Sequence, residues 1–463
     1  MKENKIYVLE SMPVPKAIMN LAIPSILSMM VNILYNLTDT FFIGKLNDPY
    51  QVAAVSISLP LFTLQMAMAG VFGVGGGSYL SRLLGRKDME AARETLSTSV
   101  LSSAVISVVL GVVGIMSIPW FLRTVGASGM TYEHATKYML YILIGSPVVL
   151  LKFTLVQLLR AEGSAKEAMI GLFIGTGMNM ILDPLFIFGF NMGVTGAAVA
   201  TVLGNAAGMM YYLQFYLRKK SLVPLTFKHM RLRWNCYREI LMIGIPASLS
   251  QVMLSIGNTI SYRLASVYSD IHVASLGVAS RIFTIPIYIF IGISIGIQAL
   301  VGYNYGAHNY PRMKATIRTA VTISLGFSAV LTLIFALFPR ALIMIFIKDE
   351  QILELGTLTL EAYVFAIPIS AVGMIMMNSL QAMGKALPAL IVSLSRQGIM
   401  YIPAILILNK AFGFEGLIFA MPLADTLTTI LSCTMLIWIV RRLKETKAQE
   451  ISINVPHPKS IRT

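Results

Sequence analysis

Long apolar segments separated by short polar breaks occupy most of this chain, and this pattern limits what it can fold into. A helix needs about 20 apolar residues to cross the roughly 30 Å hydrocarbon core of a bilayer. Runs of this kind lie at 17–43, 52–81, 96–121, 134–159, 167–190, 193–217, 239–266, 272–302, 316–339, 356–380, 386–409 and 414–440. We therefore predict an all-α polytopic membrane protein with twelve transmembrane helices.

The composition agrees with lipid as the main solvent. Of the 463 residues, 56% are hydrophobic and only 12% are charged, whereas a soluble domain carries about 25% charged residues. The net charge of +15 does not indicate nucleic acid, because the basic residues lie in short loops between apolar runs. Two cysteines, Cys236 and Cys433, suggest neither a disulfide framework nor a zinc site.

The distribution of basic residues predicts the orientation in the membrane. Most Lys and Arg residues fall in the termini and in alternate loops, with a marked concentration in the loop 218–238. Cytoplasmic loops carry such an excess of positive charge. We expect both termini to be cytoplasmic in a bacterial cytoplasmic membrane. The polar segment Met1 to Lys16 lacks the features of a cleaved signal peptide.

An internal repeat divides the chain into two similar halves. At an offset of about 221 residues, Ile23-Pro24 aligns with Ile245-Pro246 and Gly85 aligns with Gly306. Each predicted half has an even number of spans, so both halves enter the membrane from the same side and are related by a pseudo-twofold axis along its normal. We predict two six-helix bundles, with an N-lobe at 1–217, a basic linker at 218–238, a C-lobe at 239–442 and a tail at 443–463.

Two acidic residues of the first half have no acidic counterpart in the second. Asp39 aligns with Ser261, and Asp183 aligns with Ala404. A charge at the bilayer centre costs at least about 2.5–3.5 kcal/mol, so such residues usually have a function. The difference between the halves therefore directs attention to the first lobe.

These acids belong to polar stripes on three predicted spans. Residues three or four apart share one face of a helix, and the stripes comprise Asn32, Tyr35, Asn36 and Asp39, then Asn179 and Asp183, then Thr201 and Asn205. Their oxygen atoms suit a hard cation such as Na⁺, and a desolvated carboxyl group suits H⁺. We predict a cation-coupling cluster of Asp39, Asp183, Asn179, Tyr35 and Thr201, with no metal site beyond transient Na⁺.

Other polar residues have more than one interpretation. Asn32, Asn36 and Asn205 either line a substrate cavity or hydrogen-bond helices together. The sequence leaves the roles of Lys152, Arg281, Arg396 and Asp425 open.

The glycine-rich stretch Gly70 to Gly77 lies inside an apolar run and indicates close helix packing, and no GxxxxGK[ST] motif is present. We expect neither an enzyme nor a cofactor-binding protein. The 29 methionines are consistent with a cavity that adapts to several ligands.

Several stretches together resemble the MATE (multidrug and toxic compound extrusion) family. They are Ile23-Pro24 through Asp39-Thr40-Phe41-Phe42-Ile43-Gly44, Leu159-Arg160-Ala161-Glu162-Gly163, Asn179 through Gly189, and Gly193 through Thr201. The resemblance covers essentially the whole chain and is nearest to the DinF-like bacterial branch with its MepA-type exporters. The NorM-like branch carries a glutamate in its seventh span where this chain has Leu254, so the resemblance does not imply a cation site in the C-lobe.

The resemblance implies secondary active multidrug efflux by alternating access. In such a protein H⁺ or Na⁺ enters while an amphipathic, often cationic, drug leaves. It associates Pro24 with bending of the first span, and we add Pro24 and Gln157 to Asn32, Asn36 and Asn205 as candidate residues of the substrate cavity. The expected partners are small-molecule drugs, lipophilic cations and the lipid bilayer, with a monomeric protein. The alternative is a lipid-linked oligosaccharide flippase, which would need a wider and more basic cavity.

Overall fold

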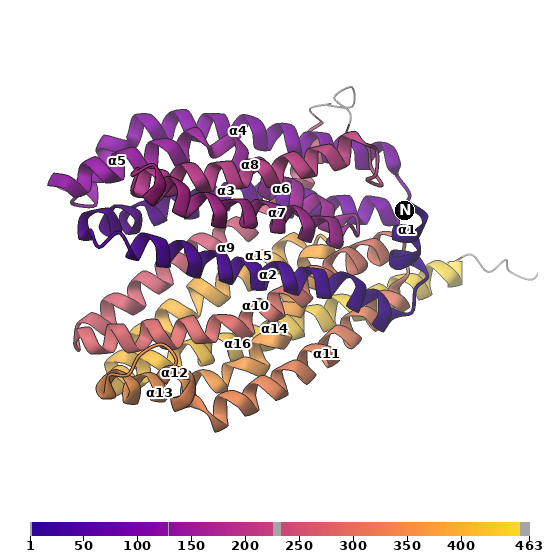
Figure 1. The fold of residues 1–463 in the computed structure, drawn as a ribbon. Helices are drawn as coiled ribbons and strands as arrows, with labels where there is room; N and C mark the ends of the chain where they lie inside the picture. Colours follow the sequence, from indigo (N-terminus) through magenta and orange to yellow (C-terminus); the bar gives the residue numbers. More distant parts are fainter. Residues whose placement is uncertain (1, 128, 226–232, 454–463) are drawn as a thin grey trace, which may run out of the picture.

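The computed structural model describes residues 2–127, 129–225 and 233–453, which fold into helices (Figure 1). The first half contains α1 (Lys2–Glu10), α2 (Val14–Gly44), α3 (Pro49–Gly85), α4 (Met89–Thr124), α5 (Gly129–Ile144), α6 (Ser146–Ala161), α7 (Ala165–Pro184), the π-helix η1 (Leu185–Gly189) and α8 (Val194–Leu217). The second half contains α9 (Trp234–Ser266), α10 (Asp270–Gly306), α11 (Tyr310–Leu337), α12 (Pro339–Met344), α13 (Glu350–Val364), α14 (Ala366–Ala382), α15 (Ala386–Leu394), the π-helix η3 (Ser395–Ile399) and α16 (Tyr401–Ile453). Residues 226–232 of the predicted linker and 454–463 of the predicted tail lie outside the described residues.

The helices confirm an all-α membrane protein. Among the described residues, nine helices are long and apolar enough to cross a bilayer, and two pairs bent by 51° and 47°, α5 with α6 and α13 with α14, raise the number to eleven. One of these segments, Ala386–Leu443, has 58 residues and would extend about 87 Å as a straight helix. It breaks at Gly413, where φ is 63° and ψ is −141°. Dividing it there gives twelve spans.

The helices extend beyond the predicted spans, and the first helix was not predicted at all. Both α3 and α10 have 37 residues, so their ends project beyond the hydrocarbon core. The helix α1 is too short to be stable alone, but Val8 and Leu9 are buried in the main hydrophobic core. Tertiary packing therefore explains a helix that its mixed polar sequence does not indicate.

The helices form two groups that the internal repeat relates to each other. In Figure 1, α2 to α8 form the upper lobe and α9 to α16 form the lower lobe. The lobes meet where α3 packs along α9 and where α2 packs along α10. A side chain on Gly75 would overlap the backbone of Ile240, and one on Gly296 would overlap the backbone of Ala22. Gly75 and Gly296 occupy equivalent positions in the repeat. The same kind of close contact between helices of opposite lobes therefore occurs at two places, once between α3 and α9 and once between α10 and α2.

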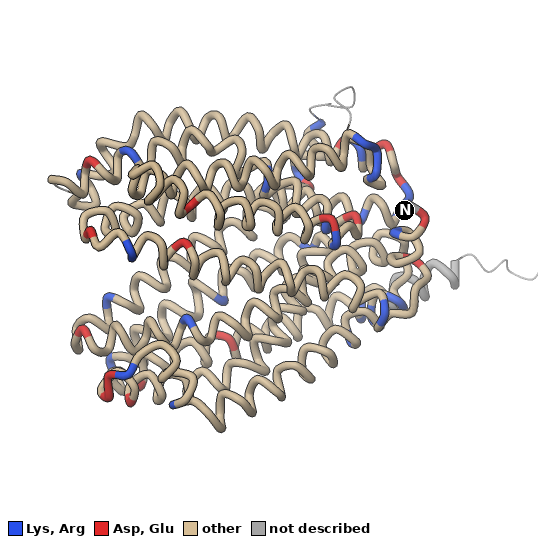
Figure 2. The backbone as a smooth tube through the Cα atoms, in the orientation of Figure 1, with Lys and Arg blue, Asp and Glu red and all other residues tan. Residues whose placement is uncertain are grey.

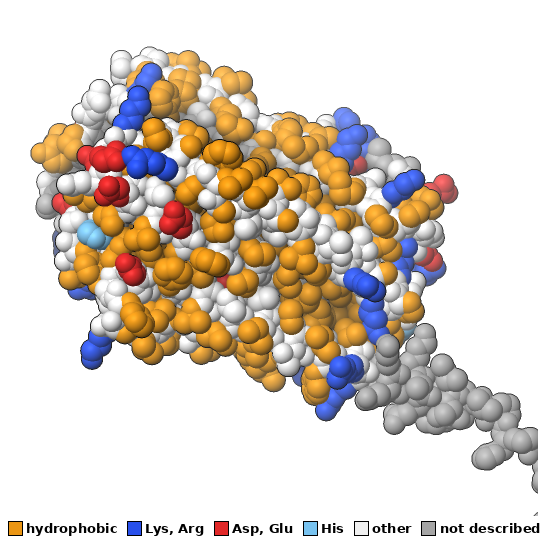
Figure 3. Space-filling view, turned by 90° about the horizontal axis from the view of Figure 1, so that it is seen from below, with side chains coloured by type: hydrophobic (Ala, Val, Ile, Leu, Met, Phe, Trp, Pro, Cys, Tyr) orange, Lys and Arg blue, Asp and Glu red, His pale blue; other side chains and the backbone are white. Residues whose placement is uncertain are grey.

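The outer surface has the polarity of a membrane protein. Figure 3 shows hydrophobic side chains across the middle of one face and charged side chains toward its two ends. In Figure 2 many Lys and Arg residues lie near the N-terminus, at the end where the two lobes approach each other. At the opposite end the two lobes diverge (Figure 1).

The turn between α6 and α7 ties the start of the linker to the N-lobe. Gly163 and its repeat partner Gly384 have φ values of +80° and +69°, a conformation that glycine adopts most readily. The buried carboxylate of Glu162 accepts hydrogen bonds from Ser164 Oγ at 2.9 Å, Ser221 Oγ at 2.5 Å and the backbone N–H of Leu222 at 3.2 Å. This carboxylate therefore fixes the chain that leaves α8.

Candidate functional site

The five residues predicted to couple the cation come together in the N-lobe. Asn179 Nδ2 donates to Asp183 Oδ1 at 3.1 Å within α7. The hydroxyl groups of Tyr35 on α2 and Thr201 on α8 are 3.5 Å apart. Asp39 interacts electrostatically with Asp183 and Tyr35. Three helices thus bring these side chains to one place, while their role in coupling stays a prediction.

Two acceptor oxygens in this cluster have no hydrogen-bond partner in the part of the chain that the structure describes. Asp183 is fully buried and Asn179 is 2% exposed. Asp183 Oδ2 and Asn179 Oδ1 accept no hydrogen bond from any residue that the structure describes. Unpaired buried polar atoms destabilise a fold by about 1–3 kcal/mol each, and here the nearby Asp39 adds negative charge. A proton on the carboxylate, or Na⁺ bound by these oxygens, would relieve both effects.

Tyr138 belongs to this cluster although the sequence analysis missed it. It lies on α5, and its hydroxyl interacts electrostatically with Asp39, Tyr35 and Asp183. The repeat alignment could have identified it, because the corresponding residue of the second half is Thr359. Tyrosine is common in apolar surroundings, so its presence on a span gave no signal by itself.

A cavity of about 340 Å³ adjoins the cluster. Three residues predicted to line the substrate cavity, Asn32, Asn36 and Asn205, line it. Pro24 and Gln157 are not among its lining residues in the part of the chain that the structure describes. Gln157 instead accepts a hydrogen bond from Arg160 Nη1 at 3.0 Å.

Lys152 also lines this cavity, and the structure identifies its partner. Its Nζ donates to Asn205 Oδ1 at 2.9 Å, and Asn205 Nδ2 donates to the carbonyl of Thr201 at 2.7 Å. The hydrogen-bonding partner of Lys152, whose role the sequence left open, is therefore a neutral amide and not the carboxylate of Asp39 or Asp183. Among the residues that the structure describes, no carboxylate forms an ion pair with this ammonium group.

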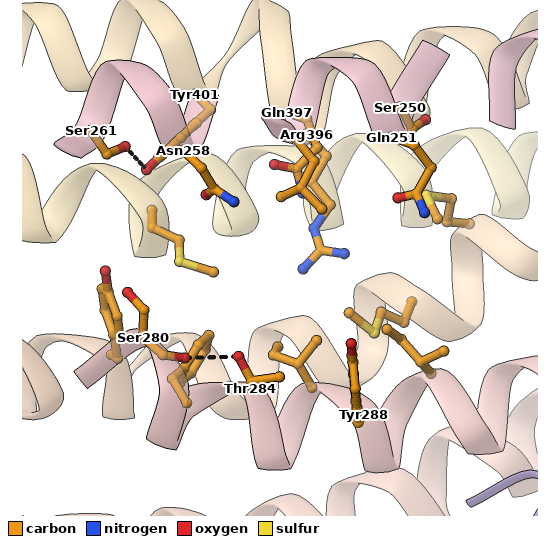
Figure 4. A pocket seen from close by; sticks show the side chains of 18 of the residues that line it. Ser250, Gln251, Asn258, Ser261, Ser280, Thr284, Tyr288, Arg396, Gln397 and Tyr401 are labelled. Atoms are coloured by element: carbon orange, nitrogen blue, oxygen red, sulfur yellow. Dashed lines mark hydrogen bonds between the residues drawn. The ribbon is translucent and has the colours of Figure 1, made fainter. Parts of the chain in front are cut away.

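A second and larger cavity, of about 520 Å³, lies in the C-lobe (Figure 4). Gln251 and Tyr288 line both cavities, so the two adjoin each other. On the C-lobe side, Arg396 Nε donates to Asp425 Oδ1 at 2.8 Å. Ser261, the repeat partner of Asp39, exchanges a hydrogen bond with Tyr401 at 2.7 Å. The two lobes thus use equivalent positions for different chemistry.

The MatE family model matches residues 24–185 and 246–406 of this chain. The chain is 31% identical over 454 residues to the multidrug export protein MepA of Staphylococcus haemolyticus (strain JCSC1435), covering 98% of this chain and 100% of that protein. It is 30% identical over 443 residues to MepA of Staphylococcus aureus (strain MRSA252), covering 95% of this chain and 97% of that protein.

Solved structures agree with these sequence relationships. A crystal structure of MATE in complex with MaL6 superimposes with a TM-score of 0.91 at 25% identity, covering 95% of this chain and 99% of that chain. An outward-facing multidrug resistance MATE family transporter of the MOP superfamily gives a TM-score of 0.88 at 26% identity, covering 95% and 98%. With two matched regions that correspond to its two lobes, the chain belongs to the MATE family of membrane transporters.

Proposed function

We propose that this protein exports amphipathic drugs, including lipophilic cations, from a bacterial cell in exchange for inward H⁺ or Na⁺. The observation that carries this proposal is the buried N-lobe cluster beside Asp39 and a polar cavity, in which Asp183 Oδ2 and Asn179 Oδ1 have no hydrogen-bond partner among the described residues. The names of the MepA relatives as multidrug export proteins support the substrate class.

The proposed orientation places both termini in the cytoplasm. The support is the concentration of Lys and Arg near the N-terminal end of the molecule (Figure 2), because cytoplasmic segments are enriched in these residues. The lobes then pack together on the cytoplasmic side, through Gly85 against Tyr303 and Gly306 against Arg82. In this orientation the structure is an outward-facing state, in which the drug leaves and the cation enters.

Coupling follows from the electrostatics of the N-lobe cluster. In the outward-facing state two nearby carboxylates, Asp39 and Asp183, repel each other in a medium of low dielectric constant. A cation that enters from outside neutralises part of this charge and so stabilises a more closely packed N-lobe. Repacking of the lobe shrinks the adjoining cavity and lowers its affinity for drug, which links cation entry to drug release. Lys152 adds a positive charge that opposes a cationic drug in the same space.

Proteoliposomes test both the export and its coupling. Purified protein is reconstituted, ethidium is the transported dye, and Na⁺ and pH gradients are imposed separately. We expect ethidium transport against its gradient under at least one ion gradient, without ATP. Transport that requires ATP would contradict the proposal, as would the absence of any gradient-driven transport by protein that is correctly inserted.

A further inference from the structure

We propose that the C-lobe cavity binds the carboxylate of a zwitterionic or anionic aromatic amphiphile through Arg281 and Arg396. The kind of molecule rests on the proposed export function. The charge preference is a property of the cavity itself and can be measured without transport.

The cavity carries a net positive charge. Its lining includes Arg281 and Arg396 but, among the described residues, no Asp or Glu. Just behind the lining, Asp425 accepts from Arg396 Nε at 2.8 Å and from Arg396 Nη2 at 3.1 Å, and it also accepts from Ser370 Oγ. One carboxylate thus neutralises one guanidinium. Within residues 2–127, 129–225 and 233–453, Arg281 forms no ion pair and no hydrogen bond through its side chain, so its charge is uncompensated.

Arg281 is accessible to a ligand. It is an exposed residue of α10 that lines the cavity, so a molecule in the cavity can reach its guanidinium group. An anionic group bound there would form a charge-assisted ion pair with it.

Arg396 can supply a second donor to the same anion. Its pair with Asp425 occupies Nε and Nη2, which leaves Nη1 available. In Figure 4 the guanidinium of Arg396 reaches into the space between α9 above and α10 below. Arg281 and Arg396 line the same cavity, and planar guanidinium groups match the two oxygens of a carboxylate.

The rest of the lining suits an aromatic ligand body. The cavity volume of about 520 Å³ is within the range of small-molecule sites. Aromatic and sulfur-containing side chains from five helices line it, and they include Tyr262, Phe283, Tyr363, Met374, Met377 and Met421. Aromatic rings offer large flat contacts, and methionine adapts to different shapes. The adjoining N-lobe cavity lies near the carboxylates of Asp39 and Asp183, which complement the cationic end of a zwitterion.

The charge preference can be measured with two dyes that differ in one group. The first is a rhodamine with a free carboxylate, and the second is the methyl ester of the same rhodamine. Binding of each to the purified full-length protein in detergent is followed by fluorescence polarisation. The variants are Arg281→Gln and Arg281→Lys. Arg263→Gln is the matched control, because Arg263 is an exposed arginine of α9 that does not line the cavity.

We expect Arg281→Gln to weaken binding of the carboxylate dye about tenfold and to leave binding of the methyl ester unchanged. Arg281→Lys should retain most of the affinity for the carboxylate dye, and Arg263→Gln should match the parent. Equal weakening of both dyes by Arg281→Gln, or no weakening of the carboxylate dye, would overturn the proposal. Binding of a short-chain anionic phospholipid is measured in the same way. If only this phospholipid depended on Arg281, the bound group would be a lipid phosphate, and the proposal would also be overturned.

A separate readout distinguishes this inference from the proposed function. Cells that express the parent protein are assayed for export of the methyl ester dye. Failure of that export would contradict the export function, whereas the binding preference of the purified protein would still support or contradict the carboxylate site.

Discussion

Arg396 forms an ion pair with Asp425, and Asp425 is the C-lobe residue that corresponds to Asn205 of the N-lobe in the internal repeat. Asn205 also meets a cation, because Lys152 Nζ donates to its Oδ1 at 2.9 Å, compared with 2.8 Å between Arg396 Nε and Asp425 Oδ1. The cations come from non-equivalent helices, α6 in the N-lobe and η3 in the C-lobe. The C-lobe pair is neutral, whereas the N-lobe contact keeps the charge of Lys152. The two lobes therefore share a scaffold but differ in the electrostatics of their cavities.

Breaking the C-lobe pair should destabilise the protein. Arg396→Met or Asp425→Asn alone leaves a buried charge without its partner, and we expect each to lower the free energy of unfolding by about 3–5 kcal/mol. The double variant Arg396→Met with Asp425→Leu removes both charges and should recover most of the loss. Thermal unfolding in detergent measures all three. If the free energy of unfolding of the double variant fell by as much as the two single-variant losses added together, the proposed charge pairing would be contradicted.

Asp183→Asn should abolish gradient-driven efflux while the protein still inserts normally. The amide keeps the size of the side chain and is less costly in lipid than a carboxylate, but it neither titrates nor binds a cation with the same charge. Membrane abundance and ethidium efflux are measured together. Asp48→Asn is the control, because Asp48 caps α3 outside the cluster and asparagine is an equally good helix cap. Normal efflux by Asp183→Asn would exclude Asp183 as the coupling residue, and loss of abundance would instead indicate a structural role.

Lys152→Gln should increase the apparent affinity for the coupling cation. The ammonium group of Lys152 repels a cation that approaches the N-lobe cluster, and the amide of glutamine can still donate to Asn205 Oδ1. We expect the half-saturating Na⁺ or H⁺ concentration for efflux to fall several-fold. The measurement is the initial rate of dye efflux as the concentration of each ion is varied. Lys152→Arg, which retains the charge, should resemble the parent, and an unchanged ion dependence in Lys152→Gln would contradict the electrostatic role.

Glu162 should make stability depend on pH. Burial raises the pKa of Glu162 above its ordinary value of 4.5, so the folded state favours the protonated carboxyl group. As the pH rises above 4.5, the unfolded chain releases this proton first, and the contribution of Glu162 to stability therefore declines. We expect the difference in Tm between Glu162→Gln and the parent to change in favour of the variant as the pH rises from 4.5 toward neutrality. Glu90→Gln, at an exposed residue of α4, should show no such trend, and a pH-independent difference for Glu162→Gln would contradict the raised pKa.

Arg312→Ala should loosen the end of the molecule where the lobes meet. Arg312 Nη2 donates to the carbonyl of Met12 at 2.6 Å, and its Nε donates to the carbonyl of Leu9 at 3.4 Å. On the other side of α1, Lys5 Nζ donates to Ser164 Oγ at 2.7 Å. The first helix therefore connects the C-lobe to the N-lobe. Because these are charge-assisted hydrogen bonds, we expect their loss to shift the population of the closed end several-fold.

Spin labels on the two lobes can detect this shift. Cysteines introduced at Glu90 on α4 and Ala315 on α11, both exposed, would report the distance between the lobes. Arg312→Ala should broaden that distance distribution toward larger values, and Arg318→Ala, at an exposed residue of the same helix, should not. An unchanged distribution in Arg312→Ala would show that α1 does not stabilise the closed end.

Much of the fold could be predicted from the sequence because the relevant information is linear. Segment length in lipid determines the number of spans, and the repeat determines their division into two lobes. The same alignment singled out Asp39 and Asp183, because it compares positions without any knowledge of distance. The helix α1 is the exception, since it depends on the burial of Val8 and Leu9 against distant residues.

Only the tertiary structure decided which polar groups meet across helices. Helical periodicity places Asn179 and Asp183 on one face, but it gives neither the approach of Tyr138 nor the choice of Asn205 as the partner of Lys152. In the same way, Arg281 and Arg396 look alike in the sequence, yet Asp425 compensates one of them and leaves the other charged. The physical reason is that hydropathy depends on the residues of a single span, whereas charge compensation depends on distances that helix packing sets.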